Sequence, residues 1–258
     1  VATALKDLDK VMIEYFMPIG NVAIYGIAIY IATVISVPQK AMHQITNPMT
    51  AEFLNTKNKK SLEDLYKKSS LNLLIVSLLI FILIITNVKQ LYELIPDEYE
   101  LSIMVVLLIS LVKLYDNLLG NNNSILFNSD YYRIVLFIGV LLVLVAFVLN
   151  LIFIPIFGIE GAAIASFIAF FIYNSVKIWL VHKKFSFLPF ASKTWLVLLI
   201  GGILSFGFYF WDFGFHPILN IGLKSILIGI SYVGLAYFLN FSSEVNSIIN
   251  KALRIKTS

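Results

Sequence analysis

The chain has 258 residues, of which 59% are hydrophobic and 13% are charged, and its formal net charge is +4. This number of polar side chains is too small to cover the surface of a soluble domain of this size. The composition therefore predicts an integral membrane protein. The basic residues are dispersed over several loops and form no groove-sized patch, which argues against nucleic acid as a partner. The absence of cysteine excludes disulfides, thiolate metal sites and a cysteine nucleophile from these residues.

Apolar runs of about 20 residues recur along the chain, as membrane-spanning helices require. The run at residues 2–16 is shorter and follows Val1 directly, so we expect it to be the truncated end of a helix. About seven complete transmembrane helices are predicted after it, at residues 22–37, 70–86, 101–119, 131–154, 162–181, 195–211 and 221–239. The expected fold is an all-α, polytopic membrane helix bundle.

Residues 38–69 connect the first two complete spans and contain one sizeable polar stretch. Pro38 is expected to kink a helix that continues out of the membrane to about Leu54. Ser61 and Asp64 have the spacing of a capping box, so a short amphipathic helix is predicted within 49–69, along the inner interface.

Cationic residues collect in every second gap between the spans. Residues 38–69 carry six lysines, whereas residues 87–100 carry one lysine and four carboxylates. Because lysine and arginine mark cytoplasmic loops, the first gap is predicted inside, and the carboxy terminus is then also cytoplasmic. Lys224 lies near the outer end of the last span, where we expect its side chain to snorkel to the headgroups.

No constellation of catalytic residues is visible in the sequence. The three histidines, His43, His182 and His216, fall at two inner edges and in one outer loop, so they cannot converge on a metal ion. No nucleophile elbow, phosphate-binding loop or zinc-protease motif is present. We therefore expect no enzyme, no metal and no cofactor.

Polar residues at membrane depth are the candidates for a transport site. Lys113, Asp116 and Asn117 share one face of the span 101–119, and Lys113 either snorkels beside Asp116 or lines a hydrophilic cavity. Arg133 and Lys177, near the inner ends of two other spans, either face a ligand or only mark the cytoplasmic side.

Asp9 and Lys10 stand in the first apolar run. They either line a cavity or belong to an interfacial helix end.

Small residues open the span 162–181. Gly161, Ala165 and Ala169 recur at intervals of four, a spacing that allows close packing of membrane helices. Glu160, just before this face, is expected to be solvated.

Two stretches of the chain resemble a known transporter family. They are LDKVMIEYFMPIGNVAIYGIAIYIATVISVPQKAMHQITNP, with Asp9, Lys10, Tyr25, Gly26 and Ala28, and FGIEGAAIASFIAF, with Phe157, Gly158, Ile159 and the run 161–165. Both are similar to the carboxy-terminal half of the O-antigen and polysaccharide flippases of the multidrug/oligosaccharidyl-lipid/polysaccharide exporter superfamily. The resemblance covers nearly the whole chain.

This resemblance implies two six-helix lobes around a central cavity, with an extra helix pair at the end. Residues 1–183 would be the second lobe and residues 184–258 the helix pair with a cytoplasmic tail, beside an amino-terminal lobe that these residues lack. The implied substrate is an undecaprenyl-pyrophosphate-linked oligosaccharide, flipped across a bacterial inner membrane for surface polysaccharide assembly, with glycan-assembly machinery as a possible partner. Cations in the cavity would suit the pyrophosphate, and polar or aromatic side chains the sugars; the candidates are Asp9, Lys10, Tyr25, Lys113 and Asn117.

Two other functions stay open. A drug/cation antiporter of the same superfamily would need a membrane-embedded carboxylate, for which Asp9 and Asp116 are the candidates. A membrane enzyme of glycan assembly, such as a polymerase or an acyltransferase, would need catalytic residues clustered on one face. The sequence alone indicates no such cluster.

Overall fold

The computed structural model describes residues 2–96 and 102–252, and the residues it describes form helices and connecting turns without a β-strand. The all-α fold class is confirmed. The elements are α1 (Ala2–Phe16), α2 (Gly20–Thr33), the 3₁₀ turn η1 (Val34–Ser36), α3 (Val37–Asn55), α4 (Lys59–Tyr92), α5 (Ile103–Leu118), α6 (Asn122–Phe127), α7 (Tyr132–Phe185), α8 (Thr194–Tyr209), α9 (Pro217–Phe238) and α10 (Ser243–Ala252).

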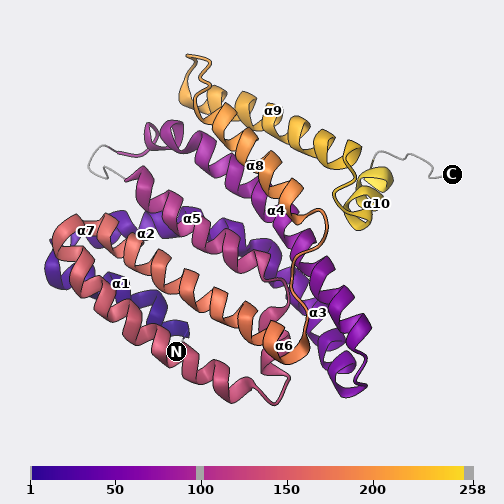
Figure 1. Ribbon diagram of the computed structural model, residues 1–258. Helices are drawn as coiled ribbons and strands as arrows, with labels where there is room; N and C mark the ends of the chain where they lie inside the picture. The colour runs from indigo at the N-terminus through magenta and orange to yellow at the C-terminus, as the bar shows by residue number, and fades with distance from the viewer. Residues whose placement is uncertain (1, 97–101, 253–258) are drawn as a thin grey trace.

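Among the described residues, four helical stretches are long and apolar enough to cross a membrane: Gly20–Asn55, α4, α7 and α9. The protein is therefore membrane-embedded. The long helices run side by side, with the α7 hairpin and α1 at one edge and the α8–α9 pair at the other (Figure 1). α4 packs against α3, α5, α8 and α9, while α5 packs against α2, α4 and α7, so these two helices occupy the centre.

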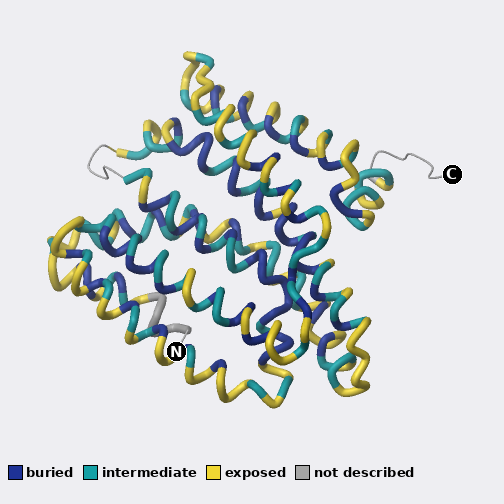
Figure 2. Tube along the Cα trace, viewed as in Figure 1, coloured by how far each residue is buried: buried dark blue, intermediate teal, exposed yellow. Residues whose placement is uncertain are grey.

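Burial follows this arrangement. The most apolar stretch of α4 has 61% of its residues buried, whereas that of α9 has only 22%. Dark blue residues accordingly gather along α4 and α5, and yellow residues along the outer sides of α7, α8 and α9 (Figure 2). An apolar side chain that is exposed in this way is stable in a bilayer, because the lipid chains are as apolar as a protein interior.

α4 is longer than the sequence predicts. It begins with an Asn58 cap, whose side chain accepts a hydrogen bond from Ser61 N at 3.1 Å, and it continues unbroken for 34 residues. At 1.5 Å per residue this is about 50 Å, against a hydrocarbon thickness of about 30 Å. The separate amphipathic helix predicted within residues 49–69 is therefore wrong, and Ser61 and Asp64 form no capping box at the helix start.

The polar first turns of α4 join the span because they pack against protein. Leu62 and Tyr66 are buried in a small core with Ile125 and Leu126 of α6 and Val135 of α7. Because of this packing, the first turns of α4 continue the spanning helix and do not form a separate helix along the interface.

The helix containing residues 22–37 continues beyond the membrane border, as predicted. The 3₁₀ turn η1 lies between α2 and α3, immediately before Pro38, and α3 then runs to Asn55. Asn117 of α5 donates from Nδ2 to the Ile35 carbonyl oxygen at 2.7 Å, which satisfies a backbone acceptor inside the turn. The kink thus has a proline and a buried amide as its causes.

α7 is a hairpin of two helical arms joined at Gly158, where φ is 60° and ψ is −137°. This conformation strains a residue with a side chain. Gly161, three residues later, crosses so close to the first arm that an added Cβ would lie 2.1 Å from the Phe153 carbonyl oxygen. Glu160 accepts a hydrogen bond from Ser102 Oγ at 2.6 Å and is only partly exposed, so the expectation of a simply solvated Glu160 is wrong.

Candidate functional site

Asp9 of α1 lies at the centre of a buried polar cluster. Its side chain is 6% exposed, and Oδ2 accepts hydrogen bonds from Tyr25 Oη at 2.8 Å and from Ser166 Oγ at 2.5 Å. Oδ1 accepts from Asn150 Nδ2 at 2.8 Å. The donors belong to α2 and to the two arms of α7, so one carboxylate links four helical segments. We call these four residues the Asp9 cluster.

The α7 hairpin makes the Asp9 cluster possible. Asn150 lies on the first arm and Ser166 on the second, eight residues on either side of Gly158. Ala162, Ala163 and Ala165 are fully buried, so the arms approach each other and α1 without a side chain between them. The small-residue face that the sequence predicts for helix packing therefore also brings two donors to Asp9.

The cluster can bind a small cation or a proton. A carboxylate removed from water needs either hydrogen-bond donors with a neutralising charge or a proton of its own. None of the cations whose side chains are described forms an ion pair with Asp9, and the neighbouring Lys10 pairs instead with Asp7 at 3.9 Å. Asn150 Oδ1 is buried without a hydrogen-bond partner.

A second polar cluster lies at the same end of the helix bundle as the lysine-rich segment 57–68. Lys177, on the second arm of α7, is 1% exposed. Its Nζ donates to Asn123 Oδ1 at 3.0 Å, pairs with Asp116 Oδ1 at 3.8 Å and lies 4.5 Å from the ring centroid of Tyr173. Gln39 of α3 donates to the other oxygen of Asp116 at 3.0 Å. This Lys177 cluster joins α3, α5, α6 and α7.

The remaining candidates are dispersed. Asn117 holds the η1 turn and does not face a cavity, so its expected place in the substrate cavity is not supported by its contacts. Arg133 is exposed and donates from Nε to Tyr132 Oη at 3.1 Å on its own helix. Lys113 is half-buried on α5, one turn before Asp116. Lys10 is 39% exposed on α1.

Lys224 contradicts its predicted snorkelling. It is fully buried between α9 and α4, where Nζ donates to the Thr86 carbonyl oxygen at 3.0 Å and to Gln90 Oε1 at 3.4 Å. Asp212 in the loop before α9 accepts from Gln90 Nε2 at 3.1 Å, which extends the contact to the helix ends. Lys224 therefore links α9 to α4.

Sequence reasoning missed Asn150, Ser166, Gln39 and Asn123 as members of these clusters. Asn150 had a usable signal, because an amide in the middle of an apolar span is costly unless it is paired. Ser166 had none, since it is one small residue among several on the packing face.

An apolar groove lies between α4, α5, α8 and the second arm of α7. Its empty volume is about 520 Å³, and it is lined mainly by leucine and phenylalanine, including Leu74, Leu111, Phe167 and Phe171. Tyr115 on its wall is hydrogen-bonded to Ser175 at 2.9 Å. Such a groove suits a hydrocarbon chain better than a sugar.

Comparison with protein-family models, with curated proteins and with solved structures finds no match to this chain. Among the described residues no three histidine, aspartate or glutamate side chains gather in a group that could hold a metal ion.

Proposed function

We propose that this chain is part of a membrane flippase that moves an undecaprenyl-pyrophosphate-linked oligosaccharide between leaflets by alternating access, in surface polysaccharide assembly. The observation that carries the proposal is the Asp9 cluster, a carboxylate buried among membrane helices and ringed by neutral donors. Ionisable groups in such positions are characteristic of ion-coupled transporters. The resemblance of the motifs around Asp9 and Gly158 to the polysaccharide flippases supplies the substrate class.

The Asp9 cluster has the chemistry of a coupling site. When Asp9 is ionised, all three of its partners donate to it, and it joins α1 and α2 to both arms of α7. A proton on Asp9 turns one acceptor into a donor, so at least one partner must reorient. A bound cation instead strengthens the ionised arrangement. Either event changes the relative stability of two helix packings, which is the requirement for a ligand-driven conformational change.

The rest of the proposal follows the resemblance. Residues 1–183 would then form the second lobe and residues 184–258 the additional helix pair. The carboxy terminus lies in the cytoplasm of a bacterial cell and the chain in its inner membrane, which the lysine-rich gaps support. The apolar groove would hold a prenyl chain, and the substrate pyrophosphate would compete with Asp116 for Lys177. No covalent step is assigned to the chain.

A complementation experiment tests this function. A strain that lacks the full-length gene should lose its surface polysaccharide and accumulate lipid-linked repeat units. The wild-type gene and an Asp7→Asn variant should restore the polysaccharide, because Asp7 is on the exposed side of α1. An Asp9→Asn variant should reach the membrane in normal amounts and fail to restore it. Normal surface polysaccharide in the deletion strain would overturn the proposal.

The second candidate function is a drug/cation antiporter. It is favoured by the same carboxylate, because proton- or sodium-driven efflux needs an ionisable group shielded from water, and Asp9 is buried among the helices. In this case the deletion strain keeps its polysaccharide and becomes sensitive to cationic drugs. A membrane enzyme would instead require that purified full-length protein alters the covalent structure of a lipid-linked glycan.

A further inference from the structure

α10 is a short amphipathic helix that follows the last membrane-spanning helix. Val245, Ile248 and Ile249 share one side at helical spacing, and Ser247 and Lys251 lie on the other. Val245 packs against the main core, but Ile248 is 68% exposed. The helix therefore packs on the protein along one edge and exposes Ile248 and Lys251 along the neighbouring edge.

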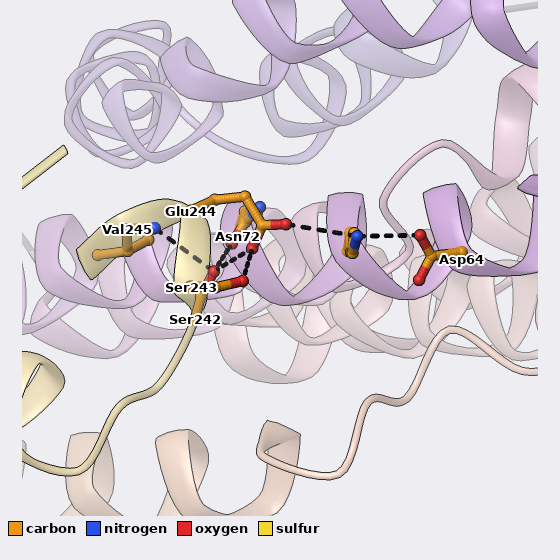
Figure 3. A network of polar contacts seen from close by, with 7 residues as sticks. Asp64, Asn72, Ser242, Ser243, Glu244 and Val245 are labelled. Carbon is orange, nitrogen blue, oxygen red and sulfur yellow. Dashed lines mark hydrogen bonds and ion pairs between the residues drawn. The ribbon is translucent and has the colours of Figure 1, made fainter. Parts of the chain in front are cut away.

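Polar contacts attach the beginning of α10 to α4 (Figure 3). Ser242 Oγ lies 2.6 Å from Asn72 Oδ1, to which it donates. Glu244 Oε1 lies 3.6 Å from Lys68 Nζ, and Lys68 in turn pairs with Asp64 at 3.0 Å. Ser242 and Glu244 thus attach the start of α10 to Asn72 and Lys68 of α4.

These contacts also set the height of α10 relative to the membrane. α4 is mainly polar from Lys59 to Asn72 and mainly apolar from Leu73 to Ile85, so Lys68 and Asn72 both lie at its polar end, and Asn72 directly precedes the apolar run. A helix fastened to both residues starts at the level of the lipid headgroups.

We propose that α10 lies in the headgroup layer and binds anionic phospholipid, with Ile248 at the acyl boundary and Lys251 at the lipid phosphates. The charges fit this ligand, because Glu244 faces Lys68 of α4 while Lys251 is followed in the sequence by Arg254 and Lys256. This inference rests on the membrane-embedded fold and stands or falls independently of the transported substrate.

Single cysteine labels test the proposal in the full-length protein. Ile248→Cys and Ser247→Cys are introduced separately, any cysteine outside these residues is replaced by serine, and each variant carries an environment-sensitive fluorophore. The protein is reconstituted in vesicles of phosphatidylcholine alone or of phosphatidylcholine with an equal part of phosphatidylglycerol, with spin-labelled lipid as quencher. Size-exclusion elution as a single symmetric peak establishes that each variant is folded.

We expect lipid quenching of the label at 248 and not at 247, and more of it in the vesicles that contain phosphatidylglycerol. Lys251→Gln should lower the ratio of lipid-contacting to water-exposed label at 248 by about fivefold, the effect of one cation at an anionic surface. Equal access of an aqueous quencher to 247 and 248 in both vesicles would overturn the proposal. So would a disulfide between two copies of Ile248→Cys protein, because a second copy would then cover this face.

Discussion

Replacing Gly161 with alanine tests whether the tight α7 hairpin holds the Asp9 cluster together. The added Cβ would lie 2.1 Å from the Phe153 carbonyl oxygen and 2.4 Å from its carbon, where ordinary contact begins at 3.4 Å. The obstacle is backbone, which has no rotamer to change. The two arms must therefore separate by more than 1 Å to bring the 2.1 Å approach to the ordinary contact distance of 3.4 Å.

The separation should reach Asp9. Asn150 and Ser166 lie on opposite arms, each within about one and a half turns of the crossing, and their hydrogen bonds to Asp9 are 2.5–2.8 Å long. Overpacking costs about 1–3 kcal/mol, and a lost hydrogen bond to a charged group about 1.5–3 kcal/mol. The arms can relieve the steric overlap by giving up a hydrogen bond to Asp9, so the two costs do not simply add. We therefore expect the free energy of unfolding to fall by about 2–4 kcal/mol.

The assay compares Gly161→Ala with Gly202→Ala on α8, where nothing lies within 4 Å of the added Cβ. Unfolding in detergent, followed by steric trapping or by thermal loss of the monodisperse peak, gives the difference in stability. Gly202→Ala should be neutral or stabilising by up to about 1 kcal/mol, the intrinsic helix preference of alanine. Equal stability and equal transport for the two variants would refute the reasoning about the hairpin.

Three further predictions concern charged residues. Asp9→Asn should abolish ion-dependent transport while Asp7→Asn retains at least half of it, measured as uptake into vesicles under an imposed proton or sodium gradient; equal activities would remove Asp9 from the coupling site. Lys177→Gln should lower transport more than Lys183→Gln does, because Lys183 is exposed over a surface tryptophan, and the matched expression of both in membranes is the control. Burial raises the pKa of the Glu244 carboxyl, but hydrogen bonds from neighbouring serines and the lysine of α4 outweigh it and hold that pKa below its ordinary value. The ion pair of Glu244 with Lys68 is thus complete above the ordinary carboxyl pKa and is lost as the pH falls through the lowered one, so a spin label on α10 should gain mobility in an acid titration, and a spectrum that stays unchanged over the whole titration would contradict this.

Hydropathy and local residue preferences were enough to predict where the long apolar helices of this chain lie, but not the short helices α6 and α10. The predicted spans 131–154 and 162–181 fall on the two arms of α7, and 195–211 and 221–239 fall on α8 and α9 within a few residues. The border region 97–101 between α4 and α5 lies outside the described residues. The kink before Pro38 and the close packing at Gly161 were also predictable. These features depend on residues that are close together in the sequence, so local sequence patterns predict them.

Only the tertiary structure decided which face of each helix meets protein. Lipid and protein interior are equally apolar, so an apolar run does not reveal its own rotation about the helix axis. Lys224 could therefore be read as snorkelling although α4 buries it, and the first turns of α4 could be read as a separate interfacial helix although α6 and α7 cover them.

The same limit applies to the Asp9 cluster. The sequence by itself marked Asp9 and Tyr25 through their motif, and it left open whether Asp9 lines a cavity or belongs to an interfacial helix end. It could not bring Asn150 and Ser166 to the carboxylate, because they lie more than 140 residues further along the chain. Their approach depends on the backbone reversal at Gly158 and on the small-residue face that follows it. Both bring together residues that are far apart in the sequence, so no local sequence pattern predicts the contact.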